Sequence, residues 1–151
     1  MKRNTEKTIT RMSLMSKKGK EKRLNQLHEE IKQLNPEILS DLNKMIRLYS
    51  QAQLIIGHLD ADALYTAGAI YAERKRVYAE TIASASGTVA EKESAAELAT
   101  YDLRIKEAEA KAESRKWQNL FKSYDNLIIA LRRDERTALE EYKKANDLYE
   151  G

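Results

Sequence analysis

Apolar residues recur at steps of three and four along most of this sequence, the spacing that places them on one face of an α-helix. The pattern predicts a short helix over residues 21–34, with a narrow apolar face. Asn35-Pro36-Glu37 then marks the start of a second helix, with Asn35 as the cap and Pro36 in the first helical position. The segment Gly57–Asp62 (GHLDAD) predicts a kink or a brief break, with Asp60 capping a further helix that runs to Gly87.

Ser86-Gly87-Thr88 is the clearest turn in the sequence, because Gly87 can adopt the left-handed conformation that ends a helix. Thr88 and Glu91 then have the spacing of a capping box, which marks the start of a last helix. Residues 89–150 contain neither Gly nor Pro, so this helix can be about 60 residues long. A short turn between two long helices predicts an antiparallel hairpin, in which residues 36–86 fold back along residues 88–150.

The apolar positions of the last helix have the spacing of a coiled coil, with a change of phase that predicts a stutter near Ser114. The set before the change consists of Leu98, Tyr101, Ile105, Ala108 and Ala112. The positions after the change spread around more than one narrow seam, so we expect partner subunits to cover what two helices cannot bury. The predicted oligomerisation residues are Trp117, Phe121, Tyr124, Leu127, Ile128 and Leu131. A monomeric bundle whose core is completed by the N-terminal helix is the alternative.

Composition agrees with a helical fold, because the 151 residues include only one Pro and five Gly. We therefore expect an all-α protein, a long antiparallel helical hairpin of coiled-coil type with a short N-terminal helix, which self-associates. The predicted organisation is a flexible basic arm over residues 1–20, followed by a single helical domain over residues 21–151. The absence of Cys excludes disulfides and thiolate metal sites. No apolar stretch reaches the roughly 18 residues of a membrane span, and the N-terminus lacks the apolar segment of a signal peptide.

The net charge of +3 conceals an asymmetry along the chain. Residues 1–35 carry ten Lys or Arg against four Glu, whereas residues 36–151 carry seventeen against twenty acidic residues. The basic N-terminal arm is expected to attract phosphate groups without sequence preference, through the release of counterions. A purely solubilising role is the alternative. The basic residues at the end of the arm that we predict to bind nucleic acid are Lys17, Lys18, Lys20, Lys22 and Arg23.

Residue constellations for catalysis are absent from the sequence. The five glycines are isolated from one another, so they do not form a phosphate-binding loop. His58, Asp60 and Asp62 form the one local cluster with metal-ligand chemistry, but a kink, a helix cap and a first-turn acid explain the three residues without a metal. Nothing associates a Ser or Thr nucleophile with His28 or His58. We therefore expect a protein that is not an enzyme and that holds no metal or cofactor.

Basic clusters interleaved with aromatic residues are a stronger theme. Arg74, Lys75 and Arg76 are consecutive cations between Tyr71 and Tyr78, two tyrosines that share roughly one helix face. Proteins bind single-stranded nucleic acid in this way when cations follow the phosphates and aromatic rings stack on the bases. In the alternative interpretation the three cations form ion pairs on a solvated helix face, and the sequence leaves both interpretations open.

The layout of the chain resembles that of the UvsY-type recombination mediator proteins of bacteriophages. The shared features span about residues 40–135 and include an early aliphatic helix, the run ERKRVY at Glu73–Tyr78, a turn with Gly87, and KWQNLFKSYDNLIIALRR at Lys116–Arg133. The resemblance implies a closed oligomer that binds single-stranded DNA without sequence preference and helps a recombinase replace single-strand-binding protein. It also implies that Lys75 and Arg76 contact DNA. The basic arm and the longer last helix depart from the family.

These observations predict a non-enzymatic homo-oligomer that binds single-stranded DNA and assists phage recombination or replication. A recombinase or a single-strand-binding protein would be a further partner, and the expected location is the cytoplasm of a bacterial host. The main alternative is a structural or assembly protein of a phage, such as a scaffold, connector or packaging component. A helical adaptor or inhibitor of a host protein is the third possibility.

Overall fold

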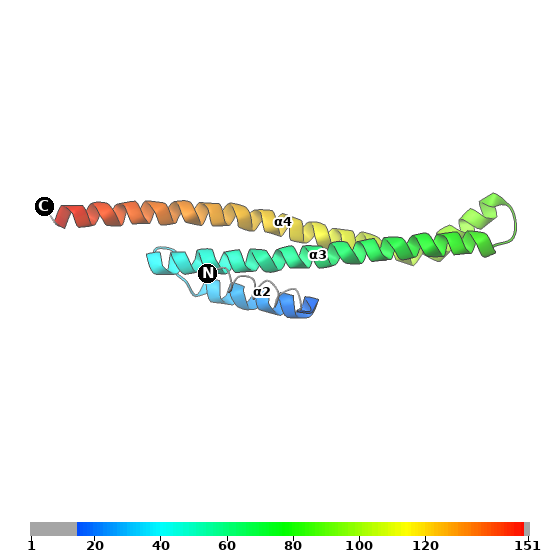
Figure 1. Ribbon diagram of the computed structural model, residues 1–151, viewed down its shortest axis with the longest axis horizontal. Coiled ribbons are helices and arrows are strands. Elements are labelled where there is room, and N and C mark those ends of the chain that lie inside the picture. Colours follow the sequence, from blue (N-terminus) through cyan, green and yellow to red (C-terminus); the bar gives the residue numbers. More distant parts are fainter. Residues whose placement is uncertain (1–14, 150–151) are drawn as a thin grey trace, which may run out of the picture. The chain divides into compact units, whose positions relative to one another are not determined.

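A computed structural model describes residues 15–149 of the chain, and the regular structure in this range is entirely helical (Figure 1). The helices are α2 (Lys17–Lys32), α3 (Leu39–Ser84) and α4 (Val89–Tyr149). The expected all-α fold is therefore confirmed. The helices contribute to two compact units, which we describe separately. Within the described residues, unit 1 comprises 15–59 and 118–149, and unit 2 comprises 60–117.

Helix α2 begins earlier than its apolar pattern predicts. The hydroxyl of Ser16 accepts a hydrogen bond from the backbone N–H of Gly19 at 3.1 Å, which caps the helix. Residues 17–20 are therefore helical, and the prediction that the flexible arm extends to residue 20 is wrong at this end. Residues 1–14 of the predicted arm lie outside the described residues. The apolar face of α2 consists of Leu24, Leu27 and Ile31, all buried in unit 1.

The segment between α2 and α3 forms a turn that is held by side chains. The Asn35 side-chain oxygen accepts a hydrogen bond from the backbone N–H of Glu37 at 3.0 Å. The backbone N–H of Asn35 donates to the carboxylate of Asp41, in the first turn of α3, also at 3.0 Å. A helix does follow the Asn-Pro-Glu signal, but it starts at Leu39, so the prediction that Asn35 is its cap and Pro36 its first residue is wrong.

Helix α3 runs through Gly57–Asp62 without interruption, so the predicted kink or break is wrong. Gly57 lies against the ring of Phe121 in unit 1, where a Cβ built at Gly57 would be 3.5 Å from the ring. Asp60 does not cap a helix, because its carboxylate accepts a hydrogen bond from the Ser114 hydroxyl in unit 2 at 2.5 Å. Both residues thus have roles in packing that their local sequence does not indicate.

The core of unit 1 receives residues from all three helices. Leu42 and Ile46 of α3 form a buried cluster with Ile128 and Leu131 of α4, and α2 contributes the residues already named. Further along α3, Ile55 and Ile56 are almost fully buried. The N-terminal helix therefore helps to bury this core within a single chain.

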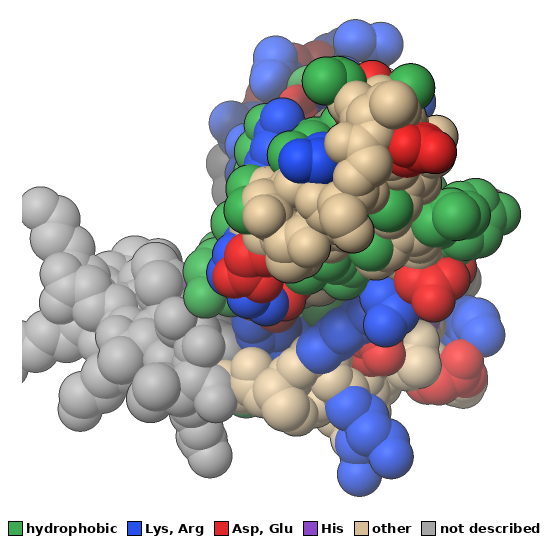
Figure 2. All heavy atoms as spheres, turned by 90° about the vertical axis from the view of Figure 1, so that its right-hand side faces the viewer, with side chains coloured by type: hydrophobic (Ala, Val, Ile, Leu, Met, Phe, Trp, Pro, Cys, Tyr) green, Lys and Arg blue, Asp and Glu red, His purple; other side chains and the backbone are tan. Residues whose placement is uncertain are grey.

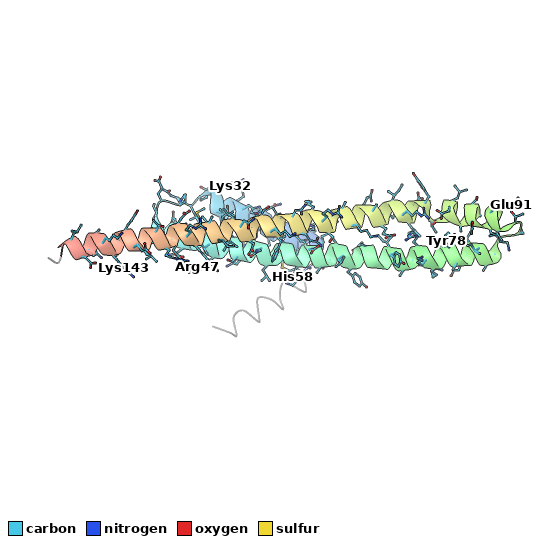
Figure 3. All side chains as sticks on the ribbon, turned by 90° about the horizontal axis from the view of Figure 1, so that it is seen from above. Lys32, Arg47, His58, Tyr78, Glu91 and Lys143 are labelled. Carbon is cyan, nitrogen blue, oxygen red and sulfur yellow. The ribbon has the colours of Figure 1, made fainter. Side chains whose placement is uncertain are left out.

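Unit 2 is a helical hairpin in which the second part of α3 packs against the first part of α4 (Figure 1). The predicted turn is confirmed, because Gly87 has a φ of 111°, in the region that side chains disfavour. The capping box is also confirmed: the Thr88 backbone N–H donates to the Glu91 carboxylate at 2.7 Å, and the Glu91 N–H donates to the Thr88 hydroxyl at 3.3 Å. Glu91 is labelled beside this turn in Figure 3.

The buried positions of α4 keep one register at steps of three and four, so the predicted stutter near Ser114 is wrong. In unit 2 these positions are Ala96, Thr100, Glu107, Ala110, Ser114 and Trp117. The larger residues that we predicted for this seam, Leu98, Tyr101 and Ile105, are 80%, 61% and 43% exposed. Most of the side chains buried in the seam are small or polar, and the buried positions of α3 in unit 2, Ala63 and Ala67, are small as well.

Most of the predicted oligomerisation residues are packed within the chain. Trp117 is buried in unit 2, and Ile128 and Leu131 are buried in unit 1. Tyr124 is half-buried, Leu127 packs against the core of unit 1, and Phe121 retains an exposed edge. The apolar side chains that led us to expect partner subunits are therefore largely covered without them, and self-association stays a prediction.

Candidate nucleic-acid interface

The three consecutive cations of α3, Arg74, Lys75 and Arg76, lie in three different environments. Arg74 turns toward α4, where its Nε donates to the Glu107 carboxylate at 2.8 Å. This ion pair is largely withdrawn from solvent, since the side chain of Arg74 is 19% exposed and that of Glu107 is 8% exposed. Arg74 is therefore part of the contact between the two helices of unit 2.

Glu107 also accepts a hydrogen bond from the Nζ of Lys111, one helical turn further along α4. Hydrogen bonds from Lys111 and then from Arg74 hold the pKa of the Glu107 carboxyl below its usual value, against the opposing effect of burial. The carboxylate is therefore ionised at neutral pH and bridges two cations.

Arg76 is held by carboxylates of its own helix. Its guanidinium donates to Glu73 and to Glu80, each at 2.6 Å, and all three side chains are exposed. Hydrogen bonds to both carboxylates raise the pKa of Arg76, and the same contact lowers the pKa of Glu73. The ion-pair interpretation of the cation run therefore describes Arg76.

Lys75 differs from its neighbours, because it forms no ion pair within the part of the chain that the structure describes. Its Nζ lies 5.7 Å from the centre of the Tyr71 ring, and the Arg74 guanidinium carbon lies 5.2 Å from the same centre. The Tyr71 ring is nonetheless 45% exposed. Tyr78, two turns further along α3, is half-buried and lies near the turn of unit 2 (Figure 3).

An open depression of about 270 Å³ lies beside these residues on the surface of unit 2. We call this feature the basic depression, and its lining residues are Arg74, Arg104, Glu107, Ala108 and Lys111. Three cations line it against one carboxylate. Arg104 forms an ion pair with Glu97 outside the depression.

Sequence reasoning missed Arg104 and Lys111 as members of this site. The two residues are seven positions apart on α4, which places them on one face about 10.5 Å apart along the helix. Neither stands in an aromatic-flanked run like that of α3. Their seven-residue spacing is the sequence signal that places the two cations on one face of a helix.

The surface around the turn of unit 2 carries both signs of charge. Figure 2 looks onto this end and shows Lys and Arg side chains lying among Asp and Glu, with hydrophobic side chains exposed between them. The view onto this end is therefore not uniformly positive. Any selective attraction of an anion depends on local arrangements such as the basic depression.

The basic residues predicted at the end of the arm belong to α2 in unit 1. Lys17, Lys18 and Lys22 are exposed, whereas Lys20 is 3% exposed. Arg23 lies 3.6 Å from the carboxylate of Glu30 on the same helix. These five cations, which we predicted as one binding group, therefore differ in burial and in their ion pairs.

The cluster of His58, Asp60 and Asp62 lies within α3 as part of a regular helix. Over residues 15–149, the structure contains no group of three or more His, Asp or Glu side chains that could hold a metal ion. Over the same residues, no helix combines the length and the apolar character that crossing a bilayer requires.

Comparison with known proteins gives no match for this chain, whether with protein-family models, with curated proteins or with solved structures.

Proposed function

We propose that this protein binds single-stranded nucleic acid through unit 2, at the surface formed by Tyr71, Lys75 and the basic depression. The observation that carries the proposal is the arrangement of three cations around one carboxylate, beside an exposed tyrosine ring. Cations attract the phosphate backbone without sequence preference, and aromatic rings stack on unpaired bases of any sequence.

The aromatic residues of such a site lie on α3, and its cations lie on both α3 and α4. Tyr71 and Tyr78 are two turns apart on α3, and Arg104 and Lys111 are two turns apart on α4. Both pairs therefore repeat at about 10.5 Å along nearly antiparallel helices. A strand lying along the hairpin would place its phosphates near Lys75 of α3 and the cations of α4, and its bases toward the tyrosines. Duplex DNA would not use the tyrosines, because its bases are already stacked.

The biological setting that we propose is phage recombination or replication, in line with the resemblance of the sequence to UvsY-type mediators. Self-association would place several such surfaces on one particle, so that weak contacts to a long strand add together. A recombinase or a single-strand-binding protein would then be the protein partner, and no catalytic role is proposed.

Replacement of Lys75 by Ala tests this function, because Lys75 is exposed and free of ion pairs within the described residues. We expect weaker binding of a fluorescein-labelled oligothymidylate, measured by anisotropy over a salt series. The slope of log K against log salt should fall by about 0.7 for the one phosphate contact removed. A duplex of the same length should bind less tightly than the single strand.

Lys143→Ala is the matched control, since Lys143 is also an exposed lysine but lies on α4 in unit 1 (Figure 3). Equal effects of the two substitutions would show that only net charge matters. Failure of the native protein to bind oligothymidylate at low salt would refute the proposal. A structural or assembly role would then be favoured, because Arg74 and Arg76 are already engaged in ion pairs within the chain.

A further inference from the structure

Glu107 occupies an unusual place for a carboxylate. It lies in the buried register of α4, between Leu103 and Ala110, at a position where the other members of the seam are small or apolar. Burial of a charge is costly unless partners compensate for it, and Glu107 has two partners, Arg74 from α3 and Lys111 from α4. The chain thus maintains an anion in the lining of its own basic depression.

The partners of Glu107 are two of the three cations that line the basic depression. A phosphate oxygen and a carboxylate oxygen accept the same charge-assisted hydrogen bonds from Arg and Lys. A phosphate that enters the depression must therefore compete with Glu107 for Arg74 and Lys111. Arg104 has a separate carboxylate partner, Glu97.

We propose that Glu107 is a built-in competitor for phosphate at the basic depression, and that it makes this site select a polyanionic strand over isolated anions. The inference rests on the proposed function and deepens it, because it assigns a specificity-determining residue to the same surface.

The selectivity follows from how the two kinds of anion compete. Glu107 is covalently part of the site, so its effective concentration is high compared with that of a free anion. One isolated phosphate makes too few contacts to displace it. A strand brings many linked phosphates, and contacts elsewhere along the strand offset the cost of displacing one carboxylate. The low pKa of Glu107 means that the competitor remains charged at every pH near neutrality.

Glu107→Gln tests the inference by removing the charge with little change in shape. We expect oligothymidylate to bind severalfold more tightly, with a salt slope steeper by about 0.7 for each cation that is released. Inorganic phosphate should compete with the labelled strand for Glu107→Gln at concentrations that leave native binding unchanged. Glu29→Gln is the control, since it removes the same charge from an exposed ion pair with Lys32 in unit 1.

Glu107→Leu provides a second route, because it removes the carboxylate altogether. It also leaves the partly buried Arg74 without its partner, so this variant should be less stable than the native protein. Circular dichroism confirms that each variant is folded before binding is measured. Tighter binding by both Glu107 variants, with Glu29→Gln unchanged, supports the inference. Native-like affinity and native-like resistance to phosphate in both folded variants would overturn it while leaving the proposed function intact. No strand binding by the native protein or by any variant would remove both.

Discussion

His28, Tyr49 and Tyr124 bring together one side chain from each of the three helices in unit 1. The Tyr124 hydroxyl is hydrogen-bonded to Nε2 of His28, and the Tyr49 ring meets the Tyr124 ring edge-on at 5.4 Å. Burial lowers the pKa of His28, the nearby Lys32 lowers it further, and Glu29 acts in the opposite direction. The neutral imidazole is therefore the form that belongs to the folded state, and this contact ties α2 to the other two helices.

Stability should consequently depend on pH near the ordinary pKa of histidine. Because the pKa of His28 is lower in the folded chain than the reference value of 6.5, the unfolded chain binds the proton more readily. The contribution of His28 is present above that value and is lost as pH falls below it. Urea unfolding at several pH values between about 7.5 and 5 should show a falling midpoint. His28→Gln should flatten this dependence, and an unchanged profile in that variant would contradict the assignment.

At the scale of elements, the ends of the helices depend on short-range hydrogen bonds that the sequence encodes. Ser16 caps α2, and the Thr88–Glu91 box starts α4. The turn before α4 also needs a residue at positive φ, which Gly87 supplies. A Cβ at Gly87 would in addition lie 2.5 Å from the Glu91 carboxylate, so the capping box itself occupies the space.

Two glycine substitutions should therefore have opposite effects. Gly87→Ala should lower the free energy of unfolding by about 1–3 kcal/mol, because it forces a strained backbone conformation. Gly68 lies in the middle of α3, and a Cβ there would meet no atom within 4 Å. Gly68→Ala should therefore raise the free energy of unfolding by about 0.5–1 kcal/mol. Chemical denaturation measures the free energy of unfolding of each variant. A Gly87→Ala variant as stable as the native protein would show that the turn is not as described.

At the scale of the whole molecule, the chain covers its longest apolar runs by packing helices within each unit. The run of five apolar residues at Leu127–Leu131 illustrates this, because consecutive positions on a helix face different directions. Ile128 is 5% exposed in the core of unit 1, whereas Ile129 is 53% exposed. Exposed hydrophobic residues such as Leu98 and Tyr101 remain on unit 2.

Ile128→Asp and Ile129→Asp make a matched pair for this arrangement. We expect Ile128→Asp to cost about 3–5 kcal/mol of stability, because it leaves an unpaired charge in the core. Ile129→Asp should change stability by less than about 0.5 kcal/mol, as an exposed substitution does. Unfolding by urea, together with the mass of each variant in solution, provides the test. Loss of an assembled state in Ile129→Asp with stability retained would place Ile129 at a contact between subunits, whereas equal destabilisation would contradict the register of α4.

Sequence reasoning succeeded where a feature depends on neighbours along the chain. The turn at Gly87, the box at Thr88 and the all-helical fold were each predictable, because residues three or four positions apart decide them. The prediction of buried positions in α4 was wrong where it relied on large apolar side chains alone. Leu98 and Ile105 have the apolar character of a seam, yet Thr100 and Glu107 occupy it.

Local spacing and backbone preferences are enough to specify the helical content, the position of the main turn and the placement of basic residues next to aromatic ones. Which of those basic residues form ion pairs depends instead on how the helices pack. Arg74 reaches across to Glu107 because α3 and α4 pack with that pair opposite, and Lys75 on the next position of the same helix faces outward. The partner of a charged side chain on another helix depends on packing between segments far apart in sequence, which local patterns do not specify.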